Sequence, residues 1–231
     1  MPGPPRAPQP RVAATLAGVG GWVDAVGFLT LFGLFTAHLS GNTARLGVEL
    51  GQGEVSLALT YLVPILVFIG GVAAGSWYMA AHRDRNTLPP LLAVEALLVT
   101  TFMVVGTSLR DAGDLTPRSA AYYGLAVLAT AAMGLQTSSL RHVCDVEVHT
   151  TFVTGMITSF AEELVASARH EPDAPRRARI HGGLVASYLV GAVCGSALDT
   201  SWRLWSLAIP VVVLGALSVG MRRPGPVSAT P

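Results

Sequence analysis

Charged residues are scarce in this sequence. Asp, Glu, Lys and Arg make up 13% of its 231 residues, whereas they make up about 25% of a typical soluble domain. Hydrophobic residues make up 51%, and the few charges are concentrated between long apolar runs. This shortage of charge argues against a soluble fold and favours a chain that is surrounded by lipid.

Lysine is absent, and all fifteen basic residues are arginine. The formal net charge of +1 provides no basic surface, so we expect no nucleic-acid partner. The two cysteines, Cys144 and Cys194, form no Cys-x-x-Cys pair or metal-ligand spacing, so we expect neither a disulfide nor a metal site. The sequence motifs of hydrolases, zinc proteases, P-loop proteins and dinucleotide-binding proteins are also missing. We therefore expect no enzyme activity, no catalytic residues and no cofactor.

Long apolar stretches dominate the rest of the chain. Six of them are long enough to cross a hydrocarbon layer of ~30 Å, which takes about 20 helical residues. They lie near 12–35, 56–80, 88–109, 119–141, 180–199 and 203–221. We therefore predict an all-α polytopic membrane protein with one membrane domain over residues 12–221. The first run is too long for a signal peptide, and we expect disorder in the proline-rich residues 1–11 and in residues 222–231.

The arginines predict the orientation of these spans. If the N-terminus faces the cytoplasm, eleven of the fifteen arginines lie in segments on the inner side and four lie on the outer side. Arginine and lysine are enriched in cytoplasmic loops of membrane proteins. We therefore expect a multi-pass protein of the bacterial cytoplasmic membrane with both termini in the cytoplasm.

Two connections between spans are unlike ordinary loops. They are residues 37–53, after the first span, and residues 141–168, after the fourth. The second predicts an amphipathic helix whose apolar side holds Phe152, Val153, Met156, Ile157, Phe160 and Leu164, opposite Ser159, Glu162 and Glu163. The first is shorter and has Leu39, Leu46 and Leu50 on one side. Each segment is expected either to lie in the membrane interface or to enter the protein as a re-entrant segment.

The two halves of the chain match at three places. Residues 21–25 correspond to 134–138, residues 40–42 to 154–156, and the Gly-x-x-x-Gly-Ser run at 71–76 to the one at 191–196. The order is the same, and the offsets are 113, 114 and 120 residues. Because each half holds three spans, we predict two repeats of opposite orientation, at about 12–109 and 119–221, with helix breaks after spans 1 and 4. The Gly-x-x-x-Gly-Ser runs predict close helix packing.

Four sequence stretches resemble the YoaK family of bacterial membrane proteins: GWVDAVGFLTL, FTAHLSGNT, MGLQTSSLR and TTFVTG. The resemblance extends from Gly18 to about Met221 and implies the membrane fold. It implies no substrate, because the family has no established biochemical function. Ser40 stands where the family usually has threonine, and Thr137 where it usually has asparagine. Both changes keep a polar side chain, so local hydrogen bonding can persist.

Asp24 is the strongest candidate for a functional residue. It lies about twelve residues into the first span, near the middle of the bilayer, where a charge costs ~2.5–3.5 kcal/mol. It should therefore face a cavity or a partner, or carry a proton. One interpretation is that Asp24 couples solute movement to protons. The other is that it only bonds a neighbouring helix and stabilises packing.

Further polar residues complete a candidate site for a solute or an ion. They are Asn42, Thr43, Gln136, Thr137, Thr151 and Thr154. Thr137 is the repeat partner of Asp24, and Gln136 lies at a nearby depth, as a site between the two repeats requires. The alternatives are an interhelical hydrogen bond for Gln136 and helix capping for the polar residues at the breaks.

A second group of residues is expected to act in gating or coupling. It consists of His38, Gly41, Glu95, Arg141, His149 and Gly155. The glycines permit backbone conformations closed to other residues, and the histidines flank the two breaks. Glu95 is expected at the inner mouth, either paired with Arg141 or Arg179 or as an interfacial carboxylate.

These features together predict a small-solute secondary transporter, with proton coupling through Asp24 as one mode of action. Its expected partners are the lipid bilayer and an unknown small solute, and a homodimer is one expected assembly. The alternatives are a membrane-embedded enzyme acting on a lipid-like substrate and a scaffold or sensor that transports nothing. The acidic and histidine residues are few and scattered, which counts against the enzyme.

Overall fold

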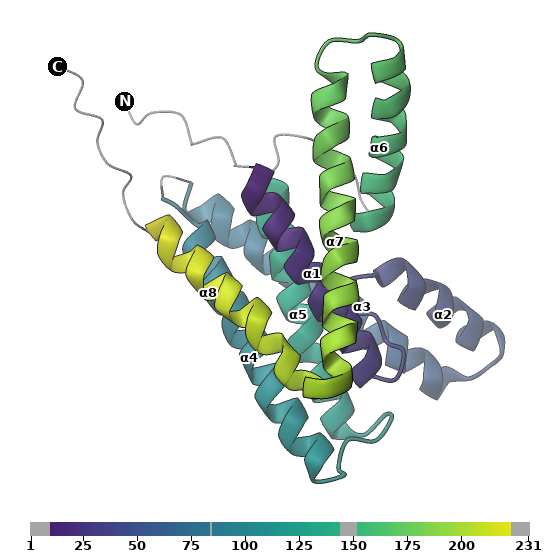
Figure 1. Ribbon diagram of the computed structural model, residues 1–231. Coiled ribbons are helices and arrows are strands. Elements are labelled where there is room, and N and C mark those ends of the chain that lie inside the picture. Colours follow the sequence, from purple (N-terminus) through teal and green to yellow (C-terminus); the bar gives the residue numbers. More distant parts are fainter. Residues whose placement is uncertain (1–9, 84, 144–151, 223–231) are drawn as a thin grey trace.

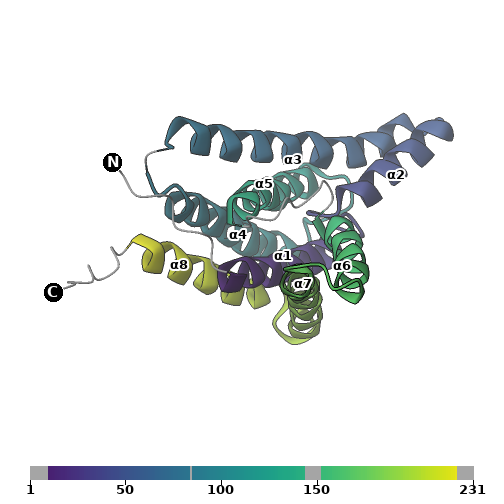
Figure 2. The ribbon, with the colours of Figure 1, turned by 90° about the horizontal axis from the view of Figure 1, so that it is seen from above.

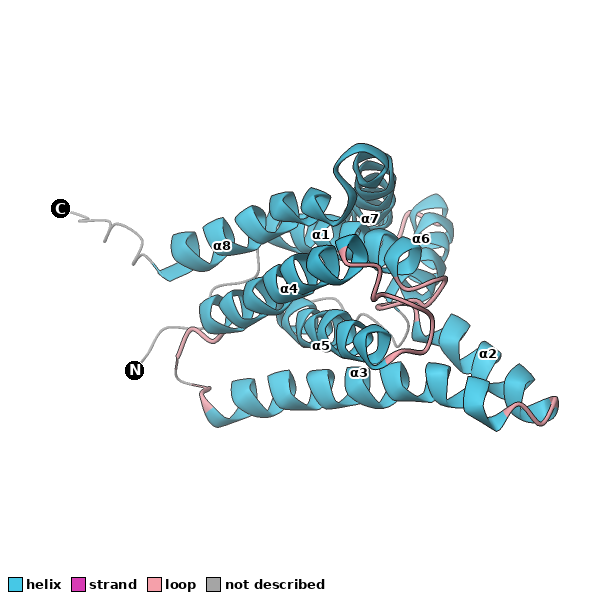
Figure 3. Ribbon diagram, turned by 90° about the horizontal axis from the view of Figure 1, so that it is seen from below, coloured by secondary structure: helices cyan, strands magenta, loops and turns pink. Residues whose placement is uncertain are grey.

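The computed structural model describes residues 10–83, 85–143 and 152–222 (Figure 1). The helices in chain order are α1 (Pro10–Thr30), α2 (Leu39–Gly51), α3 (Val55–Ala81), α4 (Leu88–Asp111), α5 (Ala120–Val143), α6 (Phe152–Ala168), α7 (Ala174–Trp202), the 3-10 turn η1 (Arg203–Leu207) and α8 (Ala208–Arg222). The described elements are all helical and are joined by loops (Figure 3), which confirms the all-α prediction. Two terminal segments were predicted to be disordered, residues 1–11 and 222–231. Of these, residues 1–9 and 223–231 lie outside the described part of the chain.

Among the described residues, four helical stretches are long and apolar enough to cross a membrane: Pro10–Thr30, Val55–Ala81, Leu88–Asp111 and the continuous stretch 174–222. The last stretch contains two helices, α7 and α8, because the chain reverses at Arg203, which has a φ of 51°. Helix α5 is not among the four, although it has 24 residues. It lies between α3 and α4 (Figure 2), so its buried side chains contact protein instead of lipid.

The outer surface of the helix bundle is apolar. Leu66, Ile69 and Trp77 of α3 are exposed, Trp77 to 73%, and α4, α7 and α8 also expose large aliphatic side chains. Soluble proteins rarely carry contiguous apolar patches larger than a few hundred Å². Such a surface suits the hydrocarbon interior of a membrane, where lipid replaces water around it.

Helix α1 crosses α7 at a point where both helices carry glycine. Gly21 faces the backbone carbonyl of Tyr188, and Gly191 faces the backbone carbonyl of Gly18. A Cβ atom at either glycine would overlap the facing carbonyl oxygen. The missing side chains therefore allow the two backbones to touch, as the small residues between membrane helices commonly do.

Helix α3 crosses α5 in the same manner. Gly134 faces the backbone carbonyl of Phe68, and Gly71 faces that of Ala131; a Cβ atom would lie 2.7 Å and 2.9 Å from the respective oxygens. Gly71 and Gly191 open the two Gly-x-x-x-Gly-Ser runs. The predicted role of these runs in close helix packing is confirmed.

Two helical hairpins project from the bundle, α2 with the start of α3 and α6 with the first half of α7 (Figure 1). In the first hairpin, the Arg45 guanidinium lies 3.2 Å from the Tyr61 hydroxyl. In the second, the Arg177 guanidinium donates to Glu163 at 2.7 Å. Helix α7 is seen end-on in Figure 2, whereas α3 is seen along its length, so the two long helices run in different directions.

Two helix boundaries differ from the sequence prediction. Helix α1 ends at Thr30 and not near residue 35, and α8 begins at Ala208 because η1 occupies the preceding five residues. The helix predicted after the fourth span is present as α6; Met156 on its apolar side is buried, whereas Ile157 and Leu164 are half-exposed. In lipid an outward apolar side chain costs nothing, so polar residues such as Glu163 can face the neighbouring helix.

The glycine contacts lead to a prediction about stability. Gly191→Ala should lower the free energy of unfolding by about 1–3 kcal/mol, because the added methyl group forces α1 and α7 apart. Gly183 lies on the same helix, and a Cβ there would meet nothing within 4 Å. Gly183→Ala should therefore be neutral or stabilise the protein by up to about 1 kcal/mol. Thermal unfolding of the two purified variants in detergent measures the difference, and equal stability would contradict the close crossing.

Candidate functional site

The chain turns back sharply after α1. Phe32 and Gly33 both have a left-handed backbone, with φ values of 53° and 89°. The Gly33 amide donates to the Phe28 carbonyl at 2.9 Å, a bond typical of a helix that ends with a left-handed residue. The turn brings residues 36–38 back to Asp24, six residues before the end of α1. The loop after α1, residues 31–38, therefore folds back against the helix bundle.

One oxygen of the Asp24 carboxylate holds this returning loop. Asp24 is only 3% exposed, and its Oδ1 accepts from the Thr36 amide at 2.8 Å, the Thr36 hydroxyl at 2.9 Å and the Ala37 amide at 2.7 Å. Gly27, about one turn further along α1, leaves room for the loop. A Cβ there would lie 2.7 Å from the Thr36 methyl carbon.

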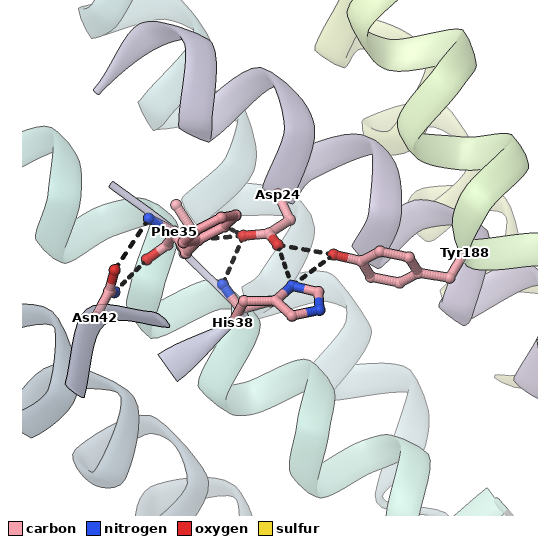
Figure 4. Close-up of polar contacts among 7 residues, drawn as sticks. Asp24, Phe35, His38, Asn42 and Tyr188 are labelled. Carbon is pink, nitrogen blue, oxygen red and sulfur yellow. Dashed lines mark hydrogen bonds and ion pairs between the residues drawn. The ribbon is translucent and has the colours of Figure 1, made fainter. Parts of the chain in front are cut away.

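The other oxygen of Asp24 faces two aromatic residues (Figure 4). The Tyr188 hydroxyl of α7 donates to Oδ2 at 2.7 Å, and His38 Nδ1 lies 2.6 Å from the same oxygen. The Tyr188 hydroxyl and His38 Nδ1 are 3.0 Å apart, and the two rings meet edge to face. The carboxylate thus joins α1, the loop after it, and α7.

The hydrogen-bonding capacity of Asp24 is filled. An ionised carboxylate accepts at about four lone-pair positions, and five groups of the protein lie within bonding distance of the two oxygens. With a proton on Nδ1, His38 donates to Asp24. Its second ring nitrogen points away from the carboxylate (Figure 4) and stays available to other groups. The structure thus provides the partner that a carboxylate inside the membrane requires.

A second clamp shapes the same loop. The buried Asn42 side chain of α2 accepts from the Phe35 amide at 3.2 Å and donates to the Phe35 carbonyl at 2.7 Å. The N-terminus of α2 itself has no side-chain cap. Asn42 therefore holds the loop before α2 and does not cap the helix. The hydroxyl of its neighbour Thr43 donates to the Leu39 carbonyl of the same helix, at 2.8 Å.

A pocket of about 390 Å³ lies beside the Asp24 carboxylate. It is lined by Gly21, Asp24, Ala25, Phe28, Leu29, Phe35, His38, Tyr188, Ala192, Val193 and Ser196. Leu29 and Val193 are 51% and 57% exposed on the apolar outer surface, so the pocket opens sideways between α1 and α7. Mostly apolar walls with a few polar groups are typical of small-molecule sites, which occupy roughly 300–1,000 Å³.

Residues 12–220 match the sequence family described as "Protein of unknown function (DUF1275)". The chain belongs to this family. It is also similar to the "UPF0700 transmembrane protein YoaK" of Bacillus subtilis (strain 168), with 24% identity over 198 residues, which cover 84% of this chain and 85% of the relative. No solved structure matches the chain. These matches confirm the family resemblance, and with the apolar helices they identify a multi-pass membrane protein.

Two residues of α5 that were predicted to belong to the solute site, Gln136 and Thr137, do not line the pocket beside Asp24. The Gln136 side chain donates to the Leu16 carbonyl of α1 at 3.1 Å. The Thr137 hydroxyl bonds to the Met133 carbonyl of its own helix at 2.8 Å. The expected grouping of Thr137 with Asp24 around one site is therefore not present in this conformation.

Glu95 differs most from the sequence expectation. It is fully buried, and among the described residues neither of its carboxylate oxygens has a hydrogen-bond partner. It belongs to the buried stripe of α4 that contains Leu92, Val99 and Phe102. Glu95 does not pair with Arg179, whose guanidinium Nε donates to the Pro175 carbonyl at 3.1 Å. Glu95 therefore lies in the core of the bundle and not at an exposed mouth.

The remaining candidates are spread over the two hairpins. Gly41 lies on α2, where a Cβ would meet the Phe35 ring at 3.1 Å. Thr154 and Gly155 lie in the first turn of α6, and the Thr154 side chain is exposed. His149, Thr151 and the side chain of Arg141 lie outside the described residues.

Sequence reasoning did not select Tyr188 or Thr36, although both bond directly to Asp24. A signal for Tyr188 exists in the sequence: it stands three residues before Gly191, so it lies on the same face of α7 as the Gly-x-x-x-Gly-Ser run. Thr36 stands two residues before His38 in the FTAHLSGNT stretch. Its role depends on the turn that reverses the chain after α1, and no short sequence motif predicts that turn.

The clamp at Phe35 leads to a second prediction. Asn42→Ala leaves the partly buried amide and carbonyl of Phe35 without their side-chain partner, which should cost about 1–3 kcal/mol. The amides of residues 34–38 should then exchange hydrogen faster. Thr43→Ala, at the exposed neighbouring position, should change neither property. Hydrogen exchange and thermal unfolding of both variants measure this effect, and an Asn42 variant as protected as the Thr43 variant would contradict the clamp.

Proposed function

We propose that this protein is a small-solute secondary transporter and that its solute site is the pocket beside Asp24, His38 and Tyr188. The observation that carries the proposal is a buried carboxylate of α1 that borders a pocket and holds the loop that follows the helix. The solute sites of secondary transporters commonly lie where the backbone leaves a helix inside the membrane. Ionisable residues inside a membrane are rare and usually functional.

We further propose that α1, α3, α4, α5, α7 and α8 are six spans built as two inverted halves. The two glycine crossings support this architecture. Gly21 faces Tyr188, and Gly134 faces Phe68; the glycines are 113 residues apart and the aromatic residues 120. These are the offsets of the sequence repeat. The α2–α3 and α6–α7 hairpins correspond in the same manner.

A comparison of the two crossings supports a role for Asp24 beyond packing. The offset of 113 relates Asp24 to Thr137, and the offset of 120 relates Tyr188 to Phe68. The second crossing therefore forms without a carboxylate or a phenol at these places. Because helix packing does not require the Asp24–Tyr188 pair, we assign that pair to solute handling.

The Asp24–His38 pair is our candidate for proton coupling. Histidine changes its charge most readily in the physiological range, and a proton on this pair alters the charge beside the pocket. From the arginine distribution we further propose that both termini face the cytoplasm of a bacterium. The Asn86 side chain bonds to the Met221 carbonyl at 2.9 Å, so the end of α8 lies beside the loop before α4.

Transport in proteoliposomes tests this proposal. Vesicles loaded with a mixture of small solutes are compared with protein-free vesicles, with and without a pH gradient, and efflux is measured by mass spectrometry. Asp24→Asn should reduce the flux about tenfold or more, because it removes the charge that holds the loop, His38 and Tyr188. Thr137→Val should retain it, because the Thr137 hydroxyl bonds only within its own helix.

The absence of protein-dependent flux for any solute would contradict the transporter. Equal flux through the wild type and Asp24→Asn would remove Asp24 from the mechanism. Flux that does not respond to the pH gradient would remove the proton coupling alone.

One observation favours a second function, an enzyme that acts on a lipid-like substrate. A carboxylate that orients a histidine is a common general-base arrangement, and here it borders a pocket that opens toward lipid. Among the lining residues, the Ser196 hydroxyl bonds to the Val193 carbonyl at 3.1 Å, so water would be the nucleophile. Incubation of the protein with bacterial lipids, followed by mass spectrometry, distinguishes the two functions: new products that disappear in His38→Gln would favour the enzyme.

A further inference from the structure

We propose that the pocket beside Asp24 binds a lipophilic organic cation, that is, a cation whose charge is covered by carbon, such as a quaternary ammonium or phosphonium ion. This inference rests on the proposed function for the location of the solute site. It adds the chemical class of the solute. Four properties of the pocket support it: its charge, its aromatic lining, the carboxylate whose hydrogen-bond acceptor positions are all occupied, and the apolar opening.

The charge of the pocket selects against anions. Among the described residues that line the pocket, Asp24 is the only acidic one, and none is arginine. The nearest arginine along α7, Arg179, is nine residues from Tyr188, about 13 Å along the helix. The guanidinium of Arg45 on α2 lies beside the Tyr61 hydroxyl. While His38 is neutral, the pocket therefore carries one negative charge that attracts a cation through a low-dielectric interior.

Aromatic rings surround the same space. Phe28, Phe35 and Tyr188 all line the pocket, and the Phe28 and Phe35 rings pack with their centres 4.7 Å apart. The face of an aromatic ring attracts a cation, most strongly where water is excluded. Recognition of quaternary ammonium groups commonly uses such rings together with a negative charge.

The occupied acceptor positions of the Asp24 carboxylate determine which kind of cation fits. All lone-pair positions of Asp24 are taken by the loop, His38 and Tyr188. A primary ammonium or an amino acid would need hydrogen-bond acceptors that the carboxylate no longer offers, and burial without them is costly. A carbon-covered cation needs no acceptor and still gains the attraction of the charge.

The opening of the pocket suits a solute that partitions into lipid. Leu29 and Val193 flank it and face the apolar outer surface. A polar solute would have to leave water and cross this apolar rim. A lipophilic cation can reach the pocket from the membrane interior.

The arrangement also makes the cation compete with a proton. The titratable groups that line the pocket are Asp24 of α1, His38 of the loop and Tyr188 of α7. A second proton on His38 cancels the charge of Asp24 and removes the attraction for the solute. Affinity for the cation should therefore fall as the pH is lowered, which is the behaviour needed to exchange a cation for a proton.

Binding of two ions of equal shape and opposite charge tests the inference. Tetraphenylphosphonium and tetraphenylborate are measured by equilibrium dialysis against the purified full-length protein in detergent, with the smaller phenyltrimethylammonium as a second cation. Each cation should bind about tenfold or more tightly than the borate, which corresponds to about 1.4 kcal/mol. Asp24→Asn should abolish this preference. Asp111→Asn, which removes an exposed carboxylate on α4, should keep it.

Two more variants cover the case in which Asp24→Asn fails to fold. Phe28→Leu keeps an apolar side chain at a partly exposed position but removes the ring, and it should weaken cation binding about three- to tenfold. His38→Gln should still bind the cation but lose the dependence of the affinity on pH.

The outcomes separate this inference from the transporter proposal. Tighter binding of the borate, or cation binding unaffected by both Asp24→Asn and Phe28→Leu, would overturn it. Cation binding without flux in vesicles would leave it standing and contradict the transporter. Protein-dependent flux of anionic solutes alone, blocked by Asp24→Asn, would support the transporter and overturn the cation assignment.

Discussion

The Asp24 carboxylate is the interaction on which the architecture around the pocket depends. It ties the loop after α1 through Thr36 and Ala37, and it ties α7 through Tyr188. A charge inside a membrane is tolerated only when such partners compensate for the lost water. The same bonds place His38 beside the pocket. Packing and the charge of the pocket are therefore linked at one residue, since the group that holds the loop after α1 also places a carboxylate beside the cavity.

Close contact between backbones makes this arrangement possible. The hydrophobic effect does not drive helices together inside lipid, so contact area between the helices carries the association. Gly21 and Gly191 bring α1 and α7 near enough for the Tyr188 hydroxyl to reach Asp24. The α3–α5 crossing uses the same device at Gly71 and Gly134. There the aromatic residue is Phe68, which has no hydroxyl group, and the polar function is confined to the first crossing.

The helices also distribute their polar groups in a manner that suits lipid. Trp77 and Val193 face outward, whereas Glu163 of α6 turns toward Arg177 of α7. Glu95 lies in the core of the bundle and has no hydrogen-bond partner among the described residues. Asp24 and Glu95 are thus buried under opposite conditions: Asp24 accepts hydrogen bonds from several donors and borders the pocket, whereas Glu95 does neither.

The sequence by itself determined the helical membrane fold, the carboxylate inside the first helix and the close packing at the glycine runs. These features are encoded locally, in the length of apolar runs, in a charge inside such a run and in residue size. Only the tertiary structure decided that α1 ends at Thr30, that Tyr188 meets Asp24, that Thr137 stays apart and that Glu95 is buried. Each of these depends on how closely two distant backbones approach and on the direction in which the chain leaves a helix. Such distances arise from the packing of the whole bundle, and no short stretch of sequence contains them.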